Sequence, residues 1–277
     1  MKHLTIKLAA TALLCLPWLP AQATVMLAGG LSHEYKLQPG GTMTGQLELR
    51  NTGKQPVEIK LYQEDVRIRA DGSTEYVPGS GSHARSNAAW ISLPTDRIVL
   101  APGAKQPIAY TLQVPNQANL AGSYWSSLVL EPVSNRSPES QLKTPQSPDK
   151  PDITIQQRVR YAVQVVTNIG NQGQANLTFS PPKISKTAKG QRQFQVDVRN
   201  TGNQFSRPKV WLDVFSPQGQ EMGRFEADTH GLYAGERESF QLNIASLPPG
   251  QYKGLLAAED NGSGQVFGSD INLNIQP

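Results

Sequence analysis

The sequence predicts an all-β protein, with two tandem immunoglobulin-like β-sandwich domains after a cleaved signal peptide. Three observations predict this fold. Apolar and polar residues alternate in many short runs, 24 glycines and 21 prolines interrupt those runs, and one series of motifs occurs twice. Alternation with a period of two buries one face of a strand and leaves the other face in water. Short strands separated by turn residues are typical of sandwiches.

Residues 1–23 have the pattern of a secretory signal peptide. Two lysines precede a mostly apolar stretch at 8–19, and Ala-Gln-Ala at 21–23 is a small-x-small cleavage site. The only cysteine, Cys15, lies inside this segment. The exported chain is therefore expected to be stabilised by burial, without disulfides.

Charge and hydropathy exclude two classes of partner. Removal of the two signal-peptide lysines lowers the formal charge from +4 to +2, and no basic run is interleaved with aromatic residues. We therefore expect no nucleic acid partner. No stretch of the exported chain reaches the roughly 18 apolar residues of a membrane helix, so we expect no membrane insertion.

The repeated motif is Arg-Asn-Thr-Gly, which ends the alternating runs LELRNTG at 47–53 and QVDVRNTG at 195–202. We expect asparagine and glycine to supply left-handed backbone for a tight turn at both places. A second pair of similar segments, each with a glycine turn, an alternating strand and a Gly-x-Tyr, lies at 100–132 and 232–260. The order of the motifs predicts two copies of one topology.

We expect the two domains at 24–168 and 175–277, with a short polar junction between them. The strands predicted in the first domain lie at 46–50, 57–62, 108–114, 123–130 and 153–165. Those predicted in the second domain include 194–198, 240–244 and 271–275.

The segment 134–152 has four prolines and one large apolar residue, Leu142. Such a segment cannot bury enough apolar surface to order itself. We expect a mobile loop within the first domain that joins its last two strands. An interdomain linker is the alternative interpretation.

The strand expected after this loop is unusually long, because its apolar residues keep one parity from 153 to 165. A terminal strand with such a face either completes the core or forms an edge that pairs with another protein. Its partner-binding candidates are Ile153, Ile155, Val159, Tyr161 and Val163.

One stretch resembles a known family. The segments AWI at 89–91, RIVL at 97–100, PG at 102–103 and QPI at 106–108, followed by Pro115, occur in this order. They resemble the first domain of the periplasmic pilus-assembly chaperones of the PapD-like superfamily, whereas the second domain resembles only a generic immunoglobulin-like sandwich.

The resemblance implies that the loop at 134–152 and the strand after it correspond to the family's variable loop and donor strand. In that family two basic residues, one in the first strand and one in the last, grip the terminal carboxylate of a pilus subunit. Lys36 is the only early cation here, and Arg158 and Arg160 are the cations of the last strand. These three residues are therefore the carboxylate-anchoring candidates.

The exported chain shows no arrangement that predicts catalysis, a cofactor or a metal. Its three histidines, His33, His83 and His230, lie far apart in the sequence. The Ser- and His-containing segment at 78–86 lacks the G-x-S-x-G frame of a nucleophile elbow. We therefore expect a protein without enzyme activity.

Two functional hypotheses follow. The first is a non-enzymatic periplasmic protein-binding module, chaperone-like or accessory, that acts by β-strand addition in the assembly of pili or surface fibres. Its partner would be a pilus or surface subunit, and an outer-membrane assembly protein is a second candidate partner. The second is a structural envelope or cell-surface protein that binds peptidoglycan, polysaccharide or another surface protein. Tyr124, Trp125 and the 70–86 loop would then be its contact surface, and a secreted or surface location stays open.

Overall fold

The computed structural model describes most of the chain after the predicted signal peptide. The described residues are 25–68, 73–79, 81–134, 137–142 and 158–276. The predicted signal peptide, Ile153 and Ile155 lie outside these ranges.

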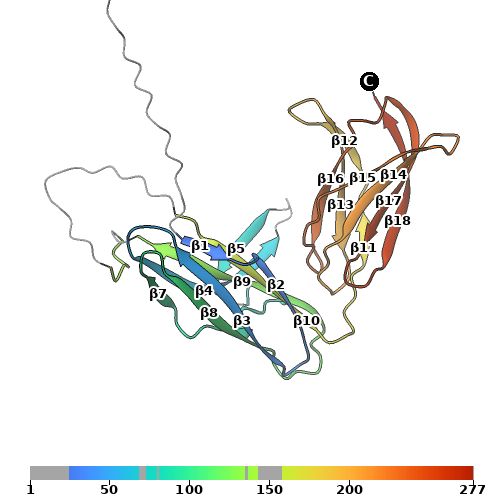
Figure 1. The fold of residues 1–277 in the computed structure, drawn as a ribbon. Coiled ribbons are helices and arrows are strands. Elements are labelled where there is room, and N and C mark those ends of the chain that lie inside the picture. Colours follow the sequence, from blue (N-terminus) through green and yellow to red (C-terminus); the bar gives the residue numbers. More distant parts are fainter. Residues whose placement is uncertain (1–24, 69–72, 80, 135–136, 143–157, 277) are drawn as a thin grey trace, which may run out of the picture.

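The described chain folds into two β-sandwiches, which confirms the predicted fold class (Figure 1). The only helical element among these residues is the 3₁₀ turn η1 (Ala88–Trp90), and none of their helices has the length and apolar character needed to cross a membrane. The strands of the first sandwich are β1 (Val25–Ala28), β2 (Ser32–Leu37), β3 (Thr42–Asn51), β4 (Val57–Ile68), β5 (Thr74–Pro78), β6 (Ile91–Ser92), β7 (Arg97–Leu100), β8 (Lys105–Gln113), β9 (Gly122–Val133) and β10 (Tyr161–Ile169). Those of the second are β11 (Leu177–Phe179), β12 (Lys183–Lys186), β13 (Arg192–Asn200), β14 (Lys209–Phe215), β15 (Glu221–Glu226), β16 (Arg237–Asn243), β17 (Gly250–Glu259) and β18 (Val266–Ile275).

The first sandwich begins with a strand that is divided between its two sheets. β1 pairs antiparallel with β3 in the sheet β1-β3-β8-β6. The chain then crosses over, and β2 pairs parallel with β10 in the other sheet, where the order is β2-β10-β9-β4. Gly29 lies at this crossing with a φ of 104°, a conformation that favours glycine. One strand thereby covers an edge of each sheet.

The last strand of the first sandwich differs from its predicted bounds, because β10 runs from Tyr161 to Ile169. Residues 158–160 are described but have no strand conformation. β9 pairs with all of β10, whereas β2 pairs only with the part from Gln164 to Ile169. The strand therefore starts later than its apolar alternation predicted.

The core of the first sandwich lies between its two sheets. Tyr110 is the largest of its fully buried side chains, and it fits because the residue opposite on β3 is Gly45. A Cβ at Gly45 would lie 2.2 Å from the Tyr110 ring. Other buried members are Leu49, Ile59, Leu100, Leu112, Leu128, Leu130, Val163 and Val165.

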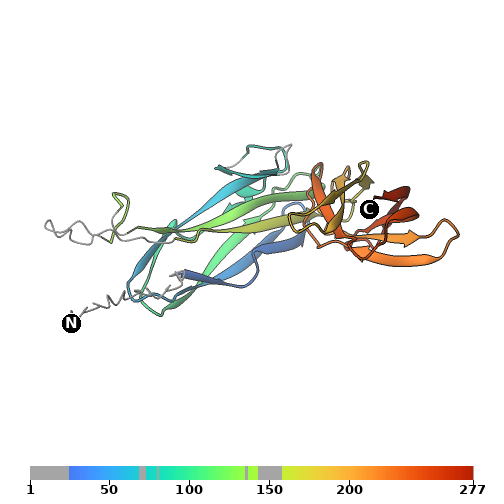
Figure 2. The same ribbon diagram turned by 90° about the horizontal axis from the view of Figure 1, so that it is seen from above.

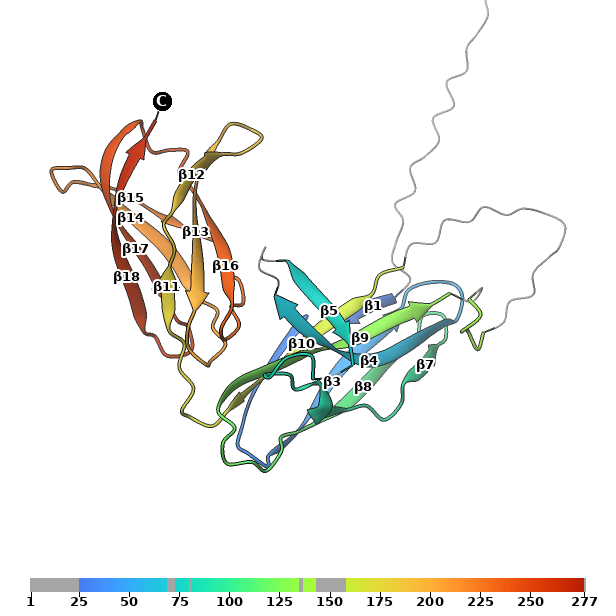
Figure 3. The ribbon, with the colours of Figure 1, turned by 180° about the vertical axis from the view of Figure 1, so that it is seen from behind.

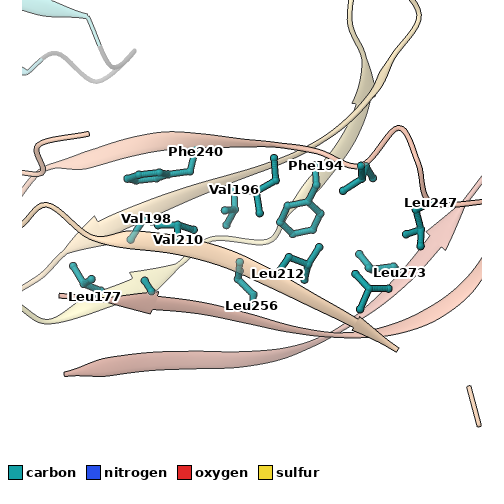
Figure 4. Close-up of a cluster of buried hydrophobic side chains, with 14 of the residues drawn as sticks. Leu177, Phe194, Val196, Val198, Val210, Leu212, Phe240, Leu247, Leu256 and Leu273 are labelled. Carbon is teal, nitrogen blue, oxygen red and sulfur yellow. The ribbon is translucent and has the colours of Figure 1, made fainter. Parts of the chain in front are cut away.

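The core of the second sandwich lies between the sheet of β11, β12, β13 and β16 and the sheet β15-β14-β17-β18. Phe194 and Phe240, both fully buried, come from the first of these sheets, and Leu212 and Leu256 meet them from the second (Figure 4). Phe194 and Phe240 hold alternating positions that the sequence predicts to face inward.

The first Asn-Thr-Gly turn is held by the side chain of Asn51, which is fully buried. Its Nδ2 donates to the carbonyls of Gln55, at 2.8 Å, and Leu100, at 3.0 Å. Its Oδ1 accepts the N–H of Gly53 at 2.9 Å. One amide group thus connects the end of β3 to its own turn and to β7.

The second copy of the motif repeats these bonds. Asn200 is also fully buried, and its Nδ2 donates to the carbonyls of Gln204 and Leu232, while its Oδ1 accepts the N–H of Gly202. The predicted left-handed backbone is wrong, because no described residue other than glycine has a positive φ and neither turn glycine has one. The side chain of the asparagine shapes the turn, and both copies of the motif make the same set of hydrogen bonds.

The two sandwiches meet at one end of the first sandwich (Figures 2 and 3). Aromatic side chains form much of this contact. Trp125 of β9 is 4% exposed and stacks on Tyr233 of the second sandwich, with 4.6 Å between ring centroids. Its ring also stacks on His83, at 5.0 Å. Val66 and Val166 complete the first sandwich's side of this contact.

Polar groups at the same junction pair the two sandwiches directly. The N–H of Ser123 donates to the carbonyl of Asn203 at 2.8 Å, and the Ser123 hydroxyl accepts the N–H of Phe205 at 2.6 Å. Arg207 forms an ion pair with Glu34 of β2 at 2.8 Å. The junction therefore combines apolar burial with directional bonds, which fixes an orientation better than burial alone.

We predict that Asn51→Ala and Asn200→Ala each lower the free energy of unfolding by about 1–3 kcal/mol, because each leaves buried carbonyls without a donor. Urea unfolding followed by circular dichroism measures the loss. The control is Asn274→Ala at an exposed strand position, for which a change within about 0.5 kcal/mol is expected. Equal effects of all three substitutions would contradict this account of the repeat.

Candidate partner-binding edge

The beginning of β10 is a short open edge. The N–H of Gln164 donates to the carbonyl of Leu31 at 2.8 Å, so it points toward β2. Because backbone groups alternate sides along a strand, the N–H of Ala162 points the same way, beyond the end of β2. Within the described residues no strand pairs with this side of Tyr161–Val163. Among the described strands, Tyr161–Val163 is therefore paired on one side only.

Side chains at this edge differ in their availability. Val163 is fully buried in the core of its own sandwich, so it is not free to fill a pocket in a partner. Tyr161 is partly buried against the same core, and its hydroxyl donates to the carbonyl of Val25 at 2.8 Å. Val159 is partly exposed, just before the strand begins. Of the predicted binding residues that are described, Val159 is the one not committed to the core.

Arg160 lies on the outer face of the sheet in a set of polar side chains. Its guanidinium forms an ion pair with Glu64 of β4 and lies over the ring of Tyr76, 5.5 Å from the ring centroid. Burial lowers the pKa of Arg160, but Glu64 and Tyr62 outweigh it, so the net pKa is raised above the usual value. Arg160 therefore stays charged, and it already forms an ion pair with Glu64 of its own sandwich.

Of the other two anchoring candidates, Arg158 lies near Arg160 and Lys36 lies far from both. Arg158 is exposed, and within the described chain it forms no ion pair. Lys36 lies on β2 opposite Asn168, eight residues along β10 from Arg160. At about 3.3 Å per residue this places Lys36 about 26 Å away, too far for both cations to hold one carboxylate. Only Arg158 and Arg160 are near the open edge.

Part of the predicted loop at 134–152 is fixed by a buried acid. Glu58 of β4 is fully buried, and its Oε2 accepts the N–H of Gln141 at 2.7 Å and the hydroxyl of Ser140 at 3.0 Å. Arg97 bonds to Oε1 of the same carboxylate and to the carbonyl of Glu139. Residues 137–142 therefore lie against β4 and β7, which differs from a loop that is mobile throughout.

These donors decide the charge of Glu58. Burial raises the pKa of its carboxyl, but the hydrogen bonds from Gln141, Arg97 and Ser140 outweigh burial and lower the net pKa below the usual value. A carboxylate that accepts several hydrogen bonds is stabilised in its charged form. We call the hydrogen bonds of the Glu58 carboxylate to Gln141, Ser140 and Arg97 the Glu58 clamp. Because the carboxylate is charged at neutral pH, the clamp is intact there.

A second buried acid of β4 holds the segment that contains His83. Asp65 is fully buried and accepts the N–H of Ser82 and the hydroxyl of Ser86. The N–H of Trp125 donates to the carbonyl of Arg85 at 2.9 Å, so this segment lies along the edge of β9. His83 and Trp125 are thereby part of the junction between the sandwiches. Trp125 is therefore covered, so it is not available to the contact surface that the envelope-protein hypothesis predicts.

Two features of the site were missed by the sequence analysis. Glu64 and Arg160 are 96 residues apart, and Glu58 is 83 residues from Gln141. Glu58 and Glu64 hold the polar positions of the alternation that Val57, Ile59 and Leu61 begin, so the sequence pattern does not distinguish them from solvent-facing residues. In the described part of the chain, no three acidic, histidine or cysteine side chains gather as a metal site.

Comparisons with known proteins give likenesses in structure alone. No protein-family model matches the chain, and no curated protein matches it. The class 5 fimbriae chaperone CfaA aligns with 13% identity over 91% of this chain and 99% of that chain, with a TM-score of 0.48. The Pseudomonas aeruginosa CupB2 chaperone aligns with 11% identity over 88% of this chain and 98% of that chain, at 0.42.

A PapD-like domain of human CEP192 aligns with 14% identity over 61% of this chain and 97% of that chain, at 0.33. Two of these three proteins are chaperones, and CfaA is a chaperone of fimbriae, the class of protein that the sequence resembles. Each of these TM-scores is below 0.5.

We predict that Arg160→Met lowers the free energy of unfolding by about 1–3 kcal/mol, because it leaves the nearly buried Glu64 unpaired. The expected loss of stability is smaller than for a fully buried ion pair, because the arginine side chain is 36% exposed. Arg158→Met is the matched control and should change stability by less than about 0.5 kcal/mol. Adding Glu64→Gln to Arg160→Met should recover part of the loss, and a double-mutant cycle without coupling would contradict the pairing.

We predict that the Glu58 clamp opens in acid. Because the folded-state pKa of Glu58 is lowered, the carboxylate stabilises the clamp above about pH 4.3, the usual pKa of glutamate, and loses this effect as the pH falls through the lowered value. Hydrogen-exchange protection of the Gln141 amide between pH 7 and pH 3 measures it. Glu58→Gln has no carboxyl to titrate and should show a flat profile. Protection that is lost on raising the pH would contradict the proposed sign.

Proposed function

We propose that this chain is an exported, non-enzymatic protein-binding module that takes up a strand of a partner protein at the beginning of β10. The observation that carries the proposal is the open backbone at Ala162, within the strand β10, whose later part from Gln164 to Ile169 is paired on both sides. A strand added there would extend a sheet that already has a buried face, and main-chain hydrogen bonds would supply the affinity.

The chemistry around this edge supports a polypeptide as the ligand. Val159 offers an apolar contact, and Arg158 offers a cation that has no internal ion pair among the described residues. Arg160 carries five N–H donors, so it can bind a partner's carboxylate while it keeps Glu64. An incoming strand that ends in a carboxylate would therefore find donors beside the open backbone.

The resemblance to pilus-assembly chaperones gives this proposal its finer form. The partner would be a pilus or surface-fibre subunit that lacks a strand of its own sheet, bound in the periplasm. Ile153 and Ile155 would extend the contact on the N-terminal side of Val159. The cation pair of the grip would be Arg158 and Arg160, without Lys36.

The alternative, a structural or glycan-binding surface protein, depends on an exposed aromatic surface. Trp125 lies between His83 and Tyr233 and is 4% exposed. Tyr124 packs on Trp90, with 4.7 Å between ring centroids, and Arg85 lies over its ring. These contacts favour a structural role for both aromatics.

We predict that Ala162→Pro abolishes partner capture and leaves the fold intact. Proline removes the one N–H that points to the open edge, and it is tolerated where a strand faces solvent. Val159→Asp should reduce capture by placing a charge in the apolar contact. The measurement is a pull-down from periplasmic extract with the purified protein, with circular dichroism and thermal unfolding to establish folding.

Tyr161→Phe is the control for this experiment, because it removes only the hydroxyl bond to Val25 and should retain the partner. If Ala162→Pro and Val159→Asp both fold and keep every partner, the edge of β10 is not the binding site. Binding to peptidoglycan or glycan that survives both substitutions would favour the alternative.

A further inference from the structure

The last strand of the second sandwich is also an edge, and a much longer one. β18 pairs with β17 along all ten of its residues, from Val266 opposite Glu259 to Ile275 opposite Gly250, with no shift in register. It is the terminal strand of the sheet β15-β14-β17-β18. Among the described residues no strand pairs with its other side, which lies away from the first sandwich (Figures 1 and 3).

The last strand is covered by a crossing strand in the first sandwich but not in the second. In the first, β2 crosses between the sheets and covers most of β10. In the second, β11 and β12 both pair with β13, so neither crosses to β18. The strand that would cover β18 in a copy of the first topology stays on the opposite sheet.

β18 also lacks the devices that keep edge strands apart. Natural edges are commonly blocked by lysine, proline or a bulge, because an open row of N–H and C=O groups is a template for pairing. The strand reads VFGSDINLNI, with one charge at Asp270, no lysine and no proline. Its unbroken register excludes a bulge. This edge is therefore suited to accept a strand.

Its alternation restricts how a second β18 could pair. Phe267, Ile271, Leu273 and Ile275 face the core, Ser269 shares their side of the strand, and the even-numbered residues face solvent. Opposite residues of an antiparallel pair share a face, so a twofold axis must pass through a residue position to keep both apolar faces together. An axis at Asp270 would place two aspartates opposite each other. An axis at Ile271 places Ile271 against itself, Asp270 against Asn272 and Phe267 against Ile275.

We propose that β18 is a self-association edge, which pairs antiparallel with β18 of a second copy about a twofold axis at Ile271. The two four-stranded sheets become one continuous sheet, and the apolar residues of both strands stay on its inner face. Such an isologous contact is self-complementary and closes at two copies.

Charge favours the same register. Lys253 of β17 is exposed and lies opposite Asn272 of β18. In the paired sheet Asp270 of the second copy follows Asn272 in the same row. It is then two strand spacings, about 10 Å, from Lys253, a span that the two side chains bridge. The symmetry makes this contact twice.

The test is sedimentation velocity of the purified protein over a range of concentrations, with two substitutions at one exposed position. The unsubstituted protein should shift toward dimer as concentration rises. Asn272→Glu places a like charge opposite Asp270 and should raise the dissociation constant about tenfold, because the repulsion occurs twice. Asn272→Lys places an opposite charge there and should leave the constant unchanged or lower it.

Cross-linking tests the axis. The sequence has one cysteine, Cys15, in the predicted signal peptide, so an introduced cysteine in the exported protein reports only contacts between copies. Under oxidation Ile271→Cys should form a disulfide-linked dimer. Ser269→Cys on the same face should not, because its two copies would be about 13 Å apart along the strands.

A protein that stays monomeric at every concentration overturns the proposal, as do equal effects of the two Asn272 substitutions or equal cross-linking of the two cysteine variants. A dimer that Ala162→Pro abolishes uses the edge of β10 and overturns it too. If the edge takes up a strand of another protein and never a second copy, self-association is wrong.

Discussion

The division of the first strand between two sheets decides which part of β10 in the first sandwich is free. β1 belongs to one sheet and β2 to the other, and the crossing at Gly29 sets where β2 begins. Because β2 starts opposite Gln164, six residues of β10 are paired on both sides and the three before them are not. The place of the open edge therefore follows from one crossing point, and the side chains around it act on a backbone site that already exists.

Buried carboxylates of β4 hold two irregular segments of the first sandwich. Glu58 fixes residues 137–142, and Asp65 fixes the segment from Ser82 to Ser86. Burying a charged group is costly unless hydrogen bonds compensate it, and here the compensating donors come from the segment being held. The acids thus convert two stretches with little apolar content into defined structure, which burial of apolar surface could not do.

Apolar alternation predicted the sandwiches well, because it reports which face of each strand is buried. It placed Val163 on an apolar face but not the first residue of β10, since alternation continues beyond the point where pairing begins. The ion pair of Arg160 with Glu64 joins residues 96 positions apart, and no local pattern links them. The repeated Asn-Thr-Gly was recognised as a turn, yet its cause was mistaken, because the hydrogen bonds of Asn51 and Asn200 depend on strands distant in sequence.

The junction between the sandwiches has a consequence for how the chain can be divided. Trp125, Val66 and Val166 are covered by Phe205, Tyr233 and Ala234, and the backbone of Ser123 is bonded to the second sandwich. Severing the polypeptide near Gly170 would uncover a tryptophan surface on one fragment and strip backbone partners from both. Each sandwich has its own core, but either fragment would expose apolar surface that the intact chain buries, so truncated forms are expected to associate or aggregate.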